Sequence, residues 1–250
     1  MTRSARRTPL AAGYILHHRP YRDTSRILET YTREFGRLTL FARGVRGPKA
    51  RLASVLQPFQ LLLFSWSGRG EAAQLTGAEA AEGDLVMGVP SACLMSAFYL
   101  NELLMKLTTR QDPLPPLFDA YHDAVEALKR VSAPGASTLE PVLRVFEKRL
   151  LEALGYGLDL GFDAESGDAV EAAGFYVFRP AQGLFPAKPG MPGVLAGSSV
   201  VGLAEEQLDT PRKLEDARRL LKIALTDCLE GRELSTRAVA RAVVRRESRS

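Results

Sequence analysis

The sequence contains few of the residues on which disulfide frameworks and metal sites depend. Of its 250 residues, two are cysteines and three are histidines. Cys93 and Cys228 lie far apart and belong to no CxxC pair, so the pattern argues against a disulfide or a cysteine zinc site and predicts two buried free thiols. His17 and His18 are adjacent in an expected strand, so they point to opposite faces and cannot share one metal ion.

Long apolar runs are also missing. No run approaches the roughly 20 residues that a membrane-spanning helix needs. Residues 1–20 place basic residues before a short apolar stretch, but Gly13 interrupts that stretch and no small-residue cleavage site follows. We therefore interpret it as a basic tail leading into a strand rather than a signal peptide. With 46% hydrophobic and 25% charged residues, the composition is that of a globular protein, which we expect to be cytoplasmic.

The common catalytic motifs are not found either. No HExxH, GxSxG, GxGxxG or SxxK occurs in its required context. A P-loop needs two glycines five positions apart followed by Lys and Ser or Thr, whereas here Gly47 follows Gly44 by three and Lys49 precedes Ala50. One acidic loop could hold Mg²⁺ for a nuclease, but it lacks a second carboxylate pair on a rigid element, so a solvated loop is favoured. Its acidic residues are Asp159, Asp163, Glu165 and Asp168.

The net charge is positive only at the two ends of the chain. Residues 1–70 contain 13 Lys and Arg against 3 Asp and Glu, a net charge of +10. Residues 71–231 contain 14 against 24, a net charge of −10, and residues 232–250 contain 6 against 2, a net charge of +4. This distribution indicates a polyanionic partner for the ends and a different partner, or none, for the middle.

The first 80 residues read as short strands separated by turns. Five segments combine β-branched or aromatic residues with a Gly or Pro stop, and they span residues 12–20, 26–36, 37–44, 59–68 and 71–80. Five strands of this length fit a small closed barrel, of which the OB type commonly binds oligonucleotides. An SH3-like barrel is the alternative.

From Ser91 onward the apolar period becomes helical. Helices are predicted over residues 91–110, 114–131, 139–157 and 211–231. Ser91 is the expected N-cap of the first helix, whose buried face would carry Leu94, Phe98, Leu103 and Leu107. Gly155 and Gly231 should end the third and fourth helices. Residues 157–200 are rich in Gly and Pro, and a hairpin or two short strands is expected within residues 175–187. Residues 235–246 could form a short basic helix.

The strongest functional signal is the loop "ARGVRGPKAR". Between Arg43 and Arg51 it holds four positive charges, no acid, two glycines and one proline. Guanidinium groups bond phosphate oxygens in pairs, and the glycines permit close approach, so this loop is predicted to bind nucleic acid. The predicted DNA-binding residues are Arg19, Arg22, Arg26, Arg37, Arg43, Arg46, Lys49 and Arg51. Interleaved aromatics that could stack on bases or fill the barrel core are Tyr14, Tyr21, Tyr31, Phe35, Phe41 and Trp66.

Taken together, these residues resemble the RecO family of bacterial recombination mediators. The resemblance runs nearly end to end and rests on "RPYRDTSRILETYTREFGRLTLFARGVRGPKARLASVLQPFQLLLFSWSGRGE", on "FYLNELLMKL" and on "EPVLRVFEKRLLEALGYG". It implies an α+β fold: an OB-fold DNA-binding domain at 1–82, a helical domain at 83–156 and 201–250, and an irregular insertion with short strands at 157–200.

The resemblance also implies a function without catalytic chemistry. Members of this family bind single- and double-stranded DNA, anneal complementary strands coated by single-stranded-DNA-binding protein (SSB), and work with RecR to load RecA, so a location with the nucleoid is expected. They grip the acidic C-terminal tail of SSB in the helical domain. Arg144 matches a family position thought to meet that tail, and Leu117, Tyr121 and Leu143 are the apolar residues expected beside it. A salt bridge from Arg144 to Glu140 or Glu147 is the alternative.

The chain departs from many members in one respect, because residues 157–185 lack the four cysteines that bind zinc there. We therefore expect no metal and no cofactor, with the hairpin held by packing of Phe175, Tyr176, Phe178 and Phe185. Two other functions stay open at this point. One is an RNA-binding or ribosome-associated OB protein that uses the same basic patch, and the other is a metal-dependent nuclease that uses the acidic loop.

Overall fold

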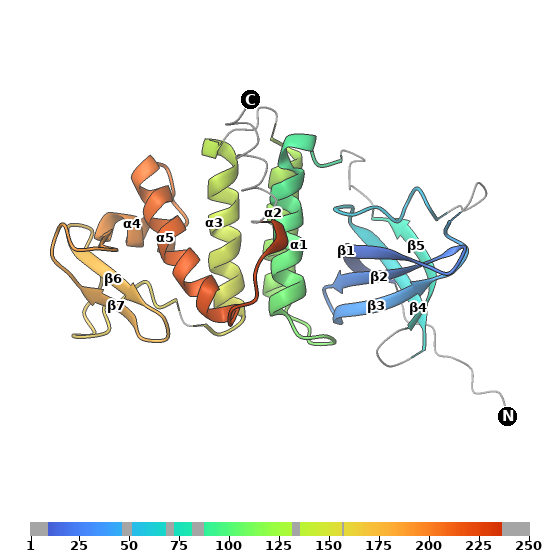
Figure 1. Cartoon of the computed structure of the whole chain (residues 1–250), viewed down its shortest axis with the longest axis horizontal. Coiled ribbons are helices and arrows are strands. Elements are labelled where there is room, and N and C mark those ends of the chain that lie inside the picture. Colours follow the sequence, from blue (N-terminus) through green and yellow to red (C-terminus); the bar gives the residue numbers. More distant parts are fainter. Residues whose placement is uncertain are drawn as a thin grey trace. The chain divides into compact units, whose positions relative to one another are not determined.

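The structure, a computed structural model, describes residues 10–46, 52–68, 73–81, 88–131, 136–156 and 158–236. Contacts between residues divide the chain into two units (Figure 1). The first unit comprises residues 1–129 and 235–250, and the second comprises residues 130–234. The first two helices therefore belong to the same unit as the N-terminal strands. The predicted division at residues 82, 156 and 200 is a different one and stays a prediction.

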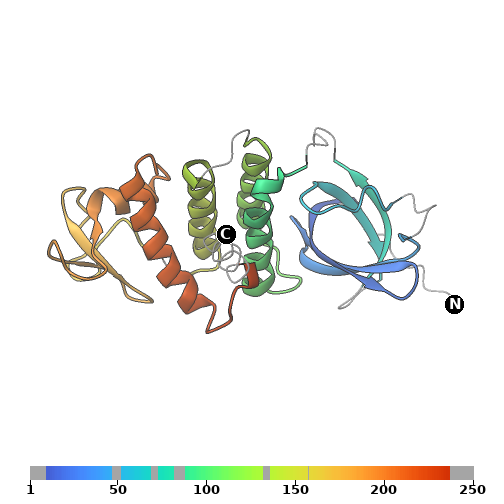
Figure 2. The same cartoon turned by 45° about the horizontal axis from the view of Figure 1, so that its top comes forward.

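Five strands of the first unit close a barrel (Figures 1 and 2). They are β1 (Ala11–Tyr21), β2 (Ser25–Thr32), β3 (Gly36–Ala42), β4 (Leu62–Ser67) and β5 (Ala73–Ala80). The order around the barrel is β1-β2-β3-β5-β4, and only the β3–β5 pair is parallel. This order is that of a five-stranded Greek-key barrel of the OB type, so the predicted α+β fold with an N-terminal OB barrel is confirmed.

The barrel interior follows from the alternation of side chains along each strand. Because successive residues point to opposite faces, one apolar set from every strand fills the interior. Its core includes Ile15, Leu28, Leu40, Leu62, Phe64, Trp66 and Leu75. Gly36, in the β2–β3 turn, has a φ of +66°, and a side chain there would collide with the backbone of Asp112.

The opposite face of β1 and β2 packs on two helices, α1 (Leu94–Leu107) and α2 (Pro115–Lys129). The rings of Tyr14 and Tyr31 lie 5.9 and 5.8 Å from that of Phe118. Asn101 of α1 is buried, and its Nδ2 donates to the carbonyl oxygen of Leu16 at 2.8 Å. The barrel and these helices therefore share one packed interface, and α2 lies within the range 114–131 predicted for the second helix.

Two predictions about the first helix are wrong. Ser91 does not cap it, because residues Ser91–Cys93 form a 3₁₀ turn (η1) and no side chain caps α1. The predicted face is also partly incorrect: Leu103 is buried as expected, but Phe98 is 41% exposed, while Ala97, Leu100 and Leu104 are buried with Asn101. The polar Asn101 at the centre of the buried face explains why apolar spacing alone misplaced that face.

The second unit combines three helices with a small sheet. Its elements are α3 (Ala136–Ala153), β6 (Phe175–Arg179), β7 (Gly183–Pro186), β8 (Leu195–Ala196), α4 (Gly197–Ala204) and α5 (Pro211–Cys228). The sheet order is β7-β6-β8, which confirms the predicted hairpin. The hydroxyl oxygen of Thr210 accepts the Lys213 N–H at 3.2 Å and Pro211 occupies the first turn, so α5 begins at residue 211 as predicted for the last helix.

The structure of this unit differs from the sequence predictions in its helices and in the packing of its hairpin. The third helix begins at Ala136, before the predicted start at residue 139, and Pro141 lies within the helix. Helix α4 was not predicted. Of the four aromatics assigned to the hairpin, only Tyr176 is buried, and Leu184 supplies the fully buried side chain of β7.

Two further expectations concern the whole chain. Cys93 and Cys228 are buried free thiols, as expected. No helix in the described ranges is long and apolar enough to span a membrane.

Candidate nucleic-acid interface

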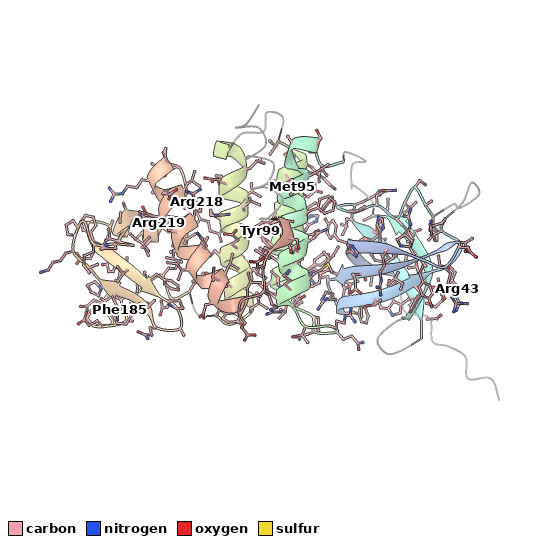
Figure 3. The ribbon with its side chains drawn as sticks, viewed as in Figure 1. Arg43, Met95, Tyr99, Phe185, Arg218 and Arg219 are labelled. Atoms are coloured by element: carbon pink, nitrogen blue, oxygen red, sulfur yellow. The ribbon has the colours of Figure 1, made fainter. Side chains whose placement is uncertain are left out.

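Five arginines gather at one end of the barrel and define what we call the arginine patch. Arg19, Arg22 and Arg26 come from β1, β2 and the turn between them, and Arg43 and Arg46 follow the end of β3. Figure 3 shows Arg43 at the end of the barrel strands, on the side away from α1. Four of the five are exposed and Arg26 is half-buried.

Strand register brings these arginines together. In the β1–β2 hairpin Pro20 pairs with Arg26 and Arg19 pairs with Ile27. Arg26 in turn lies opposite Ala42 of β3, next to Arg43. Neighbouring strands are about 4.8 Å apart, so the five cations occupy one small end of the barrel.

The loop that leaves β3 is anchored before it enters residues 47–51. Val45 is buried in the barrel core between the exposed Gly44 and Arg46. The Arg46 N–H donates to the Thr24 carbonyl oxygen at 3.0 Å, and its guanidinium donates to the Arg22 carbonyl oxygen at 3.3 Å. The first part of the loop is thus fixed to the tip of the β1–β2 hairpin, which keeps Arg46 close to Arg22.

The backbone of the patch adopts two left-handed conformations. Gly44 has a φ of +65°, which glycine adopts without steric cost. Arg22 has a φ of +51°, which costs a non-glycine residue on the order of 1 kcal/mol. Such residues persist only where the surrounding structure imposes them, and they are frequent at functional sites. The conformation of Arg22 therefore agrees with a functional role for the patch.

The local electrostatics are strongly positive. Within residues 19–26 and 43–46 Asp23 is the single acid against five arginines. Burial, and then the positive charges of Arg26 and His17, hold the pKa of His18 below its ordinary value. This end of the barrel can therefore attract a polyanion and neutralise several phosphates.

One aromatic of the predicted set lies in the patch with an exposed ring. Tyr21 is 37% exposed, packs edge-on against Phe41 at 5.4 Å, and has the Arg22 guanidinium 5.3 Å from its ring centre. In contrast, Tyr14, Tyr31 and Trp66 are buried, and the ring of Phe35 packs against that of Trp66 at 5.1 Å. Tyr21 is thus the ring in the patch best placed to stack on a base.

One described residue of the predicted DNA-binding set, Arg37, is not part of the patch. Arg37 sits at the opposite end of β3, where its guanidinium donates to the Thr108 carbonyl oxygen at 2.8 Å. Burial, followed by the charge of Arg110, lowers its pKa, although Glu29 acts in the opposite direction. Lys49 and Arg51 lie outside the described residues.

The residues predicted to meet the SSB tail are mostly buried. Arg144 on α3 is 8% exposed, and its guanidinium donates to Glu147 Oε1 at 2.8 Å. Leu143 beside it is half-buried. Leu117 and Tyr121 belong to α2 in the other unit, are fully buried, and the Tyr121 hydroxyl donates to Asn101 Oδ1 at 2.5 Å. The intrahelical salt bridge named as the alternative for Arg144 is therefore present.

In the acidic loop, the carboxylate of Asp163 accepts hydrogen bonds from the residues that follow it. Asp163 Oδ1 accepts the N–H groups of Glu165 and Ser166 at 3.0 and 2.8 Å, and Oδ2 accepts the Ser166 hydroxyl at 2.7 Å. Hydrogen bonds from Ser166 are the main cause of its lowered pKa. In the part of the chain that the structure describes, no three His, Cys, Asp or Glu side chains are arranged to hold a metal ion.

Sequence reasoning did not single out two features of the structure. Helix α5 exposes Arg212, Arg218 and Lys222, and Figure 3 shows Arg218 and Arg219 on it. The spacing of these basic residues along the predicted helix could have indicated that they share its exposed side. Glu102 on α1 accepts hydrogen bonds from Ser235 and Thr236, and because more than 130 residues separate these partners, no local pattern indicated the contact.

Comparison with known proteins covers both units. The family model described as "Recombination protein O N terminal" matches residues 9–83, and that described as "Recombination protein O C terminal" matches residues 93–239. The arginine patch lies entirely within the first match, and Arg144 lies within the second.

Curated proteins named "DNA repair protein RecO" match nearly the whole chain. The protein from Methylococcus capsulatus is 41% identical over 236 residues, which is 94% of each chain. Those from Azoarcus sp. and Nitrosococcus oceani are each 39% identical, over 91% and 93% of this chain and 93% of their own length.

Proposed function

The chain belongs to the RecO family of DNA repair proteins, and from this premise we propose that it binds single- and double-stranded DNA through the arginine patch and anneals complementary strands coated by SSB. In this proposal it also assists RecR in loading RecA. It performs no catalytic step, needs no cofactor, and acts in the cytoplasm at the nucleoid.

The arginine patch is the observation that carries the proposal. Five guanidinium groups sit on three adjacent strand ends and their turns, with one acid among them. Guanidinium groups that meet phosphates make no base-specific contact, so the surface can follow a phosphate backbone of any sequence.

Annealing has a direct physical cause in such a surface. Two complementary strands repel each other through their phosphates, and each Lys or Arg that meets a phosphate releases counterions and reduces that repulsion. Base pairing then discriminates the correct partner. The protein supplies charge and proximity, and it needs no base-specific contact.

The proposed contact with the SSB tail lies on α3 of the second unit. We keep Arg144 with Leu143 as the proposed contact for the acidic SSB tail, because Arg144 matches the family position. Glu147 already accepts a bond from Arg144, so a tail carboxylate would share or displace it. Arg144→Ala should reduce affinity for an acidic tail peptide while binding to naked DNA persists, and equal peptide binding by variant and parent would contradict the assignment.

The experiment that tests the function is annealing of complementary strands coated by SSB, compared with strands coated by SSB lacking its acidic tail. The parent chain should accelerate annealing with intact SSB and lose most of that acceleration without the tail. Arg43→Ala with Arg46→Ala should lose it in both cases. Arg212→Ala with Arg218→Ala, which removes the same charge from exposed positions of the second unit, is the matched control and should anneal like the parent.

A further inference from the structure

The outer face of strands β1 to β3 carries two aromatic rings at the end where the arginine patch lies. Register places Arg19 of β1 opposite Ile27 of β2, and Ile27 opposite Phe41 of β3, so these three residues form a row across the sheet. Residues next to Ile27 and Phe41 along their strands belong to the barrel core, so the row itself faces outward. Tyr21 follows Arg19 by two residues on β1 and points to the same outer face.

The ring of Tyr21 is exposed and yet held in place. Tyr21 is 37% exposed, and its ring packs against that of the half-buried Phe41 at 5.4 Å with an angle of 61° between the planes. Such tilted aromatic pairs are a favoured packing geometry. The strands therefore fix a flat apolar ring beside the arginines, on the outer surface of the barrel.

Arg22 already contacts this ring with a flat cationic group. Its guanidinium carbon lies 5.3 Å from the centre of the Tyr21 ring, and its side chain is exposed. A cation–π contact at an exposed site is weaker than the stacking of a nucleobase on an aromatic ring. A base can therefore replace Arg22 on the ring, and the released guanidinium is then free to bond the phosphate next to that base.

Phosphate contacts alone do not distinguish a single strand from a duplex, because both present phosphates to the arginine patch. Stacking on a side chain does distinguish them, since it requires an unpaired base with an accessible face. Within a duplex the faces of each base are covered by the neighbouring base pairs. An exposed ring among the arginines is thus the part of this surface that responds to the state of the bases.

We propose that Tyr21 stacks on an unpaired base of the strand whose phosphates meet the arginine patch, and that this contact raises the affinity for single strands without raising the affinity for duplex. The inference rests on the proposed DNA-binding function and adds to it the residue that selects the substrate strand. When two strands pair, their bases enter the duplex and leave Tyr21. The annealed product then keeps only the phosphate contacts.

The test measures binding of the full chain to three DNA probes of equal length. They are a single strand, the corresponding duplex, and a single strand of abasic sites, which keeps the phosphates but has no bases. Tyr21→Ala should weaken binding to the normal single strand about fivefold or more. Its duplex affinity and its slope of log K against log salt should stay those of the parent, because the phosphate contacts remain. The parent should bind the abasic strand more weakly than the normal one, whereas Tyr21→Ala should bind both about equally.

Two further variants serve as controls. Tyr21→Phe keeps the ring and should bind every probe within about twofold of the parent. Phe35→Ala is the matched control, because Phe35 is also 37% exposed and its ring also packs edge-on against another, that of Trp66 at 5.1 Å. Phe35 lies in the turn between β2 and β3, at the opposite end of β2 from the patch, so this variant should bind every probe like the parent.

Unchanged single-strand affinity in Tyr21→Ala would overturn the proposal. So would an equal loss for all three probes, because Tyr21 would then only support the structure of the patch. Arg43→Ala with Arg46→Ala separates these results from a failure of the proposed function. If that variant loses affinity for all three probes while Tyr21→Ala loses none, the role of Tyr21 is wrong and the DNA-binding function stands. If it binds every probe like the parent, the proposed function itself is wrong.

Discussion

Arg144 and Glu147 form a buried ion pair within one helix. Their closest atoms are 2.8 Å apart, and both side chains are at most 10% exposed. Arg144→Ala withdraws a cationic partner from a buried carboxylate, so we expect the free energy of unfolding to fall by about 3 kcal/mol in urea denaturation.

The control for this prediction is a second pair with the same spacing. Arg218 and Glu215 are also three residues apart on their helix, but both side chains are about half exposed. Arg218→Ala should therefore cost under about 1 kcal/mol. Equal losses from the two substitutions would contradict the view that burial makes the Arg144 pair structural.

Tyr121 is a residue for which a structural and a partner-binding role can be separated. Its hydroxyl donates to Asn101, which also bonds the Leu16 carbonyl oxygen of β1. Tyr121→Phe should lower the free energy of unfolding by about 1 kcal/mol because it deletes one buried hydrogen bond. Affinity for an acidic SSB-tail peptide should stay unchanged, as it should for Tyr156→Phe on the exposed Tyr156. A specific loss of peptide affinity in Tyr121→Phe would restore this residue to the partner site.

Which arginines could be predicted depended on strand geometry. The sequence identified Arg43 and Arg46 correctly as part of a positive cluster, since the loop stands out by charge. Arg37 is only six residues from Arg43, yet a strand advances about 3.3 Å per residue, so the two lie at opposite ends of β3. Composition shows that the segment is basic, but only the register of the strands shows which arginines lie close together.

At the level of elements, Glu206 links α3 to the end of α4. Its two carboxylate oxygens accept bonds from Arg149 at 3.0 and 2.6 Å, and Oε1 accepts one from Lys148 at 3.2 Å. Glu206 has a φ of +61° and follows the C-cap residue of α4, Glu205, and the next N–H, that of Gln207, donates to the Gly202 carbonyl oxygen at 2.7 Å. A residue in the left-handed region thus contacts two cationic partners.

Glu206 should make the stability of the protein sensitive to acid. The bond from Arg149, opposed by partial burial and supported by Lys148, lowers its pKa. A lowered carboxyl pKa stabilises the fold above the ordinary value of about 4.3 and loses that effect as pH falls through the lowered value. Glu206→Gln should therefore reduce the free energy of unfolding by about 1 kcal/mol at pH 7, and this loss should shrink steadily as the pH is lowered below about 4.3. A loss that stays the same size throughout an acid titration of the folded protein would contradict this.

Periodicity predicted the elements better than it predicted their faces. The five strands and the last helix are found where the alternation and the caps indicated. Helix α4 was missed because "GSSVVGLA" is too short and too rich in Gly and Ser to show a helical pattern. The buried face of α1 was misplaced because a polar residue, Asn101, lies at its centre and is satisfied by distant partners that no local pattern reveals.

At the scale of the whole molecule, the uneven charge along the chain follows the barrel segment rather than the two units. The arginine patch lies in the basic first 70 residues, but residues 71–129 of the same unit contain 3 Lys and Arg against 9 Asp and Glu, a net charge of −6. The second unit contains 12 against 16, a net charge of −4. The basic character of the first segment could be predicted from the sequence. That helices α1 and α2 belong with the barrel could not, because it depends on Tyr14, Tyr31 and Asn101 meeting partners far along the chain.

The most direct test of the central claim is the salt dependence of binding to single-stranded DNA, measured for the parent and for Arg43→Ala with Arg46→Ala. If about four phosphates are met, the slope of log K against log salt should be near −3, at roughly 0.7 per contact. The double variant should bind every sequence more weakly with a slope about 1.4 shallower, while Arg212→Ala with Arg218→Ala keeps the parent slope. Unchanged affinity and slope in the patch variant would contradict the assignment of the arginine patch as the DNA-binding surface.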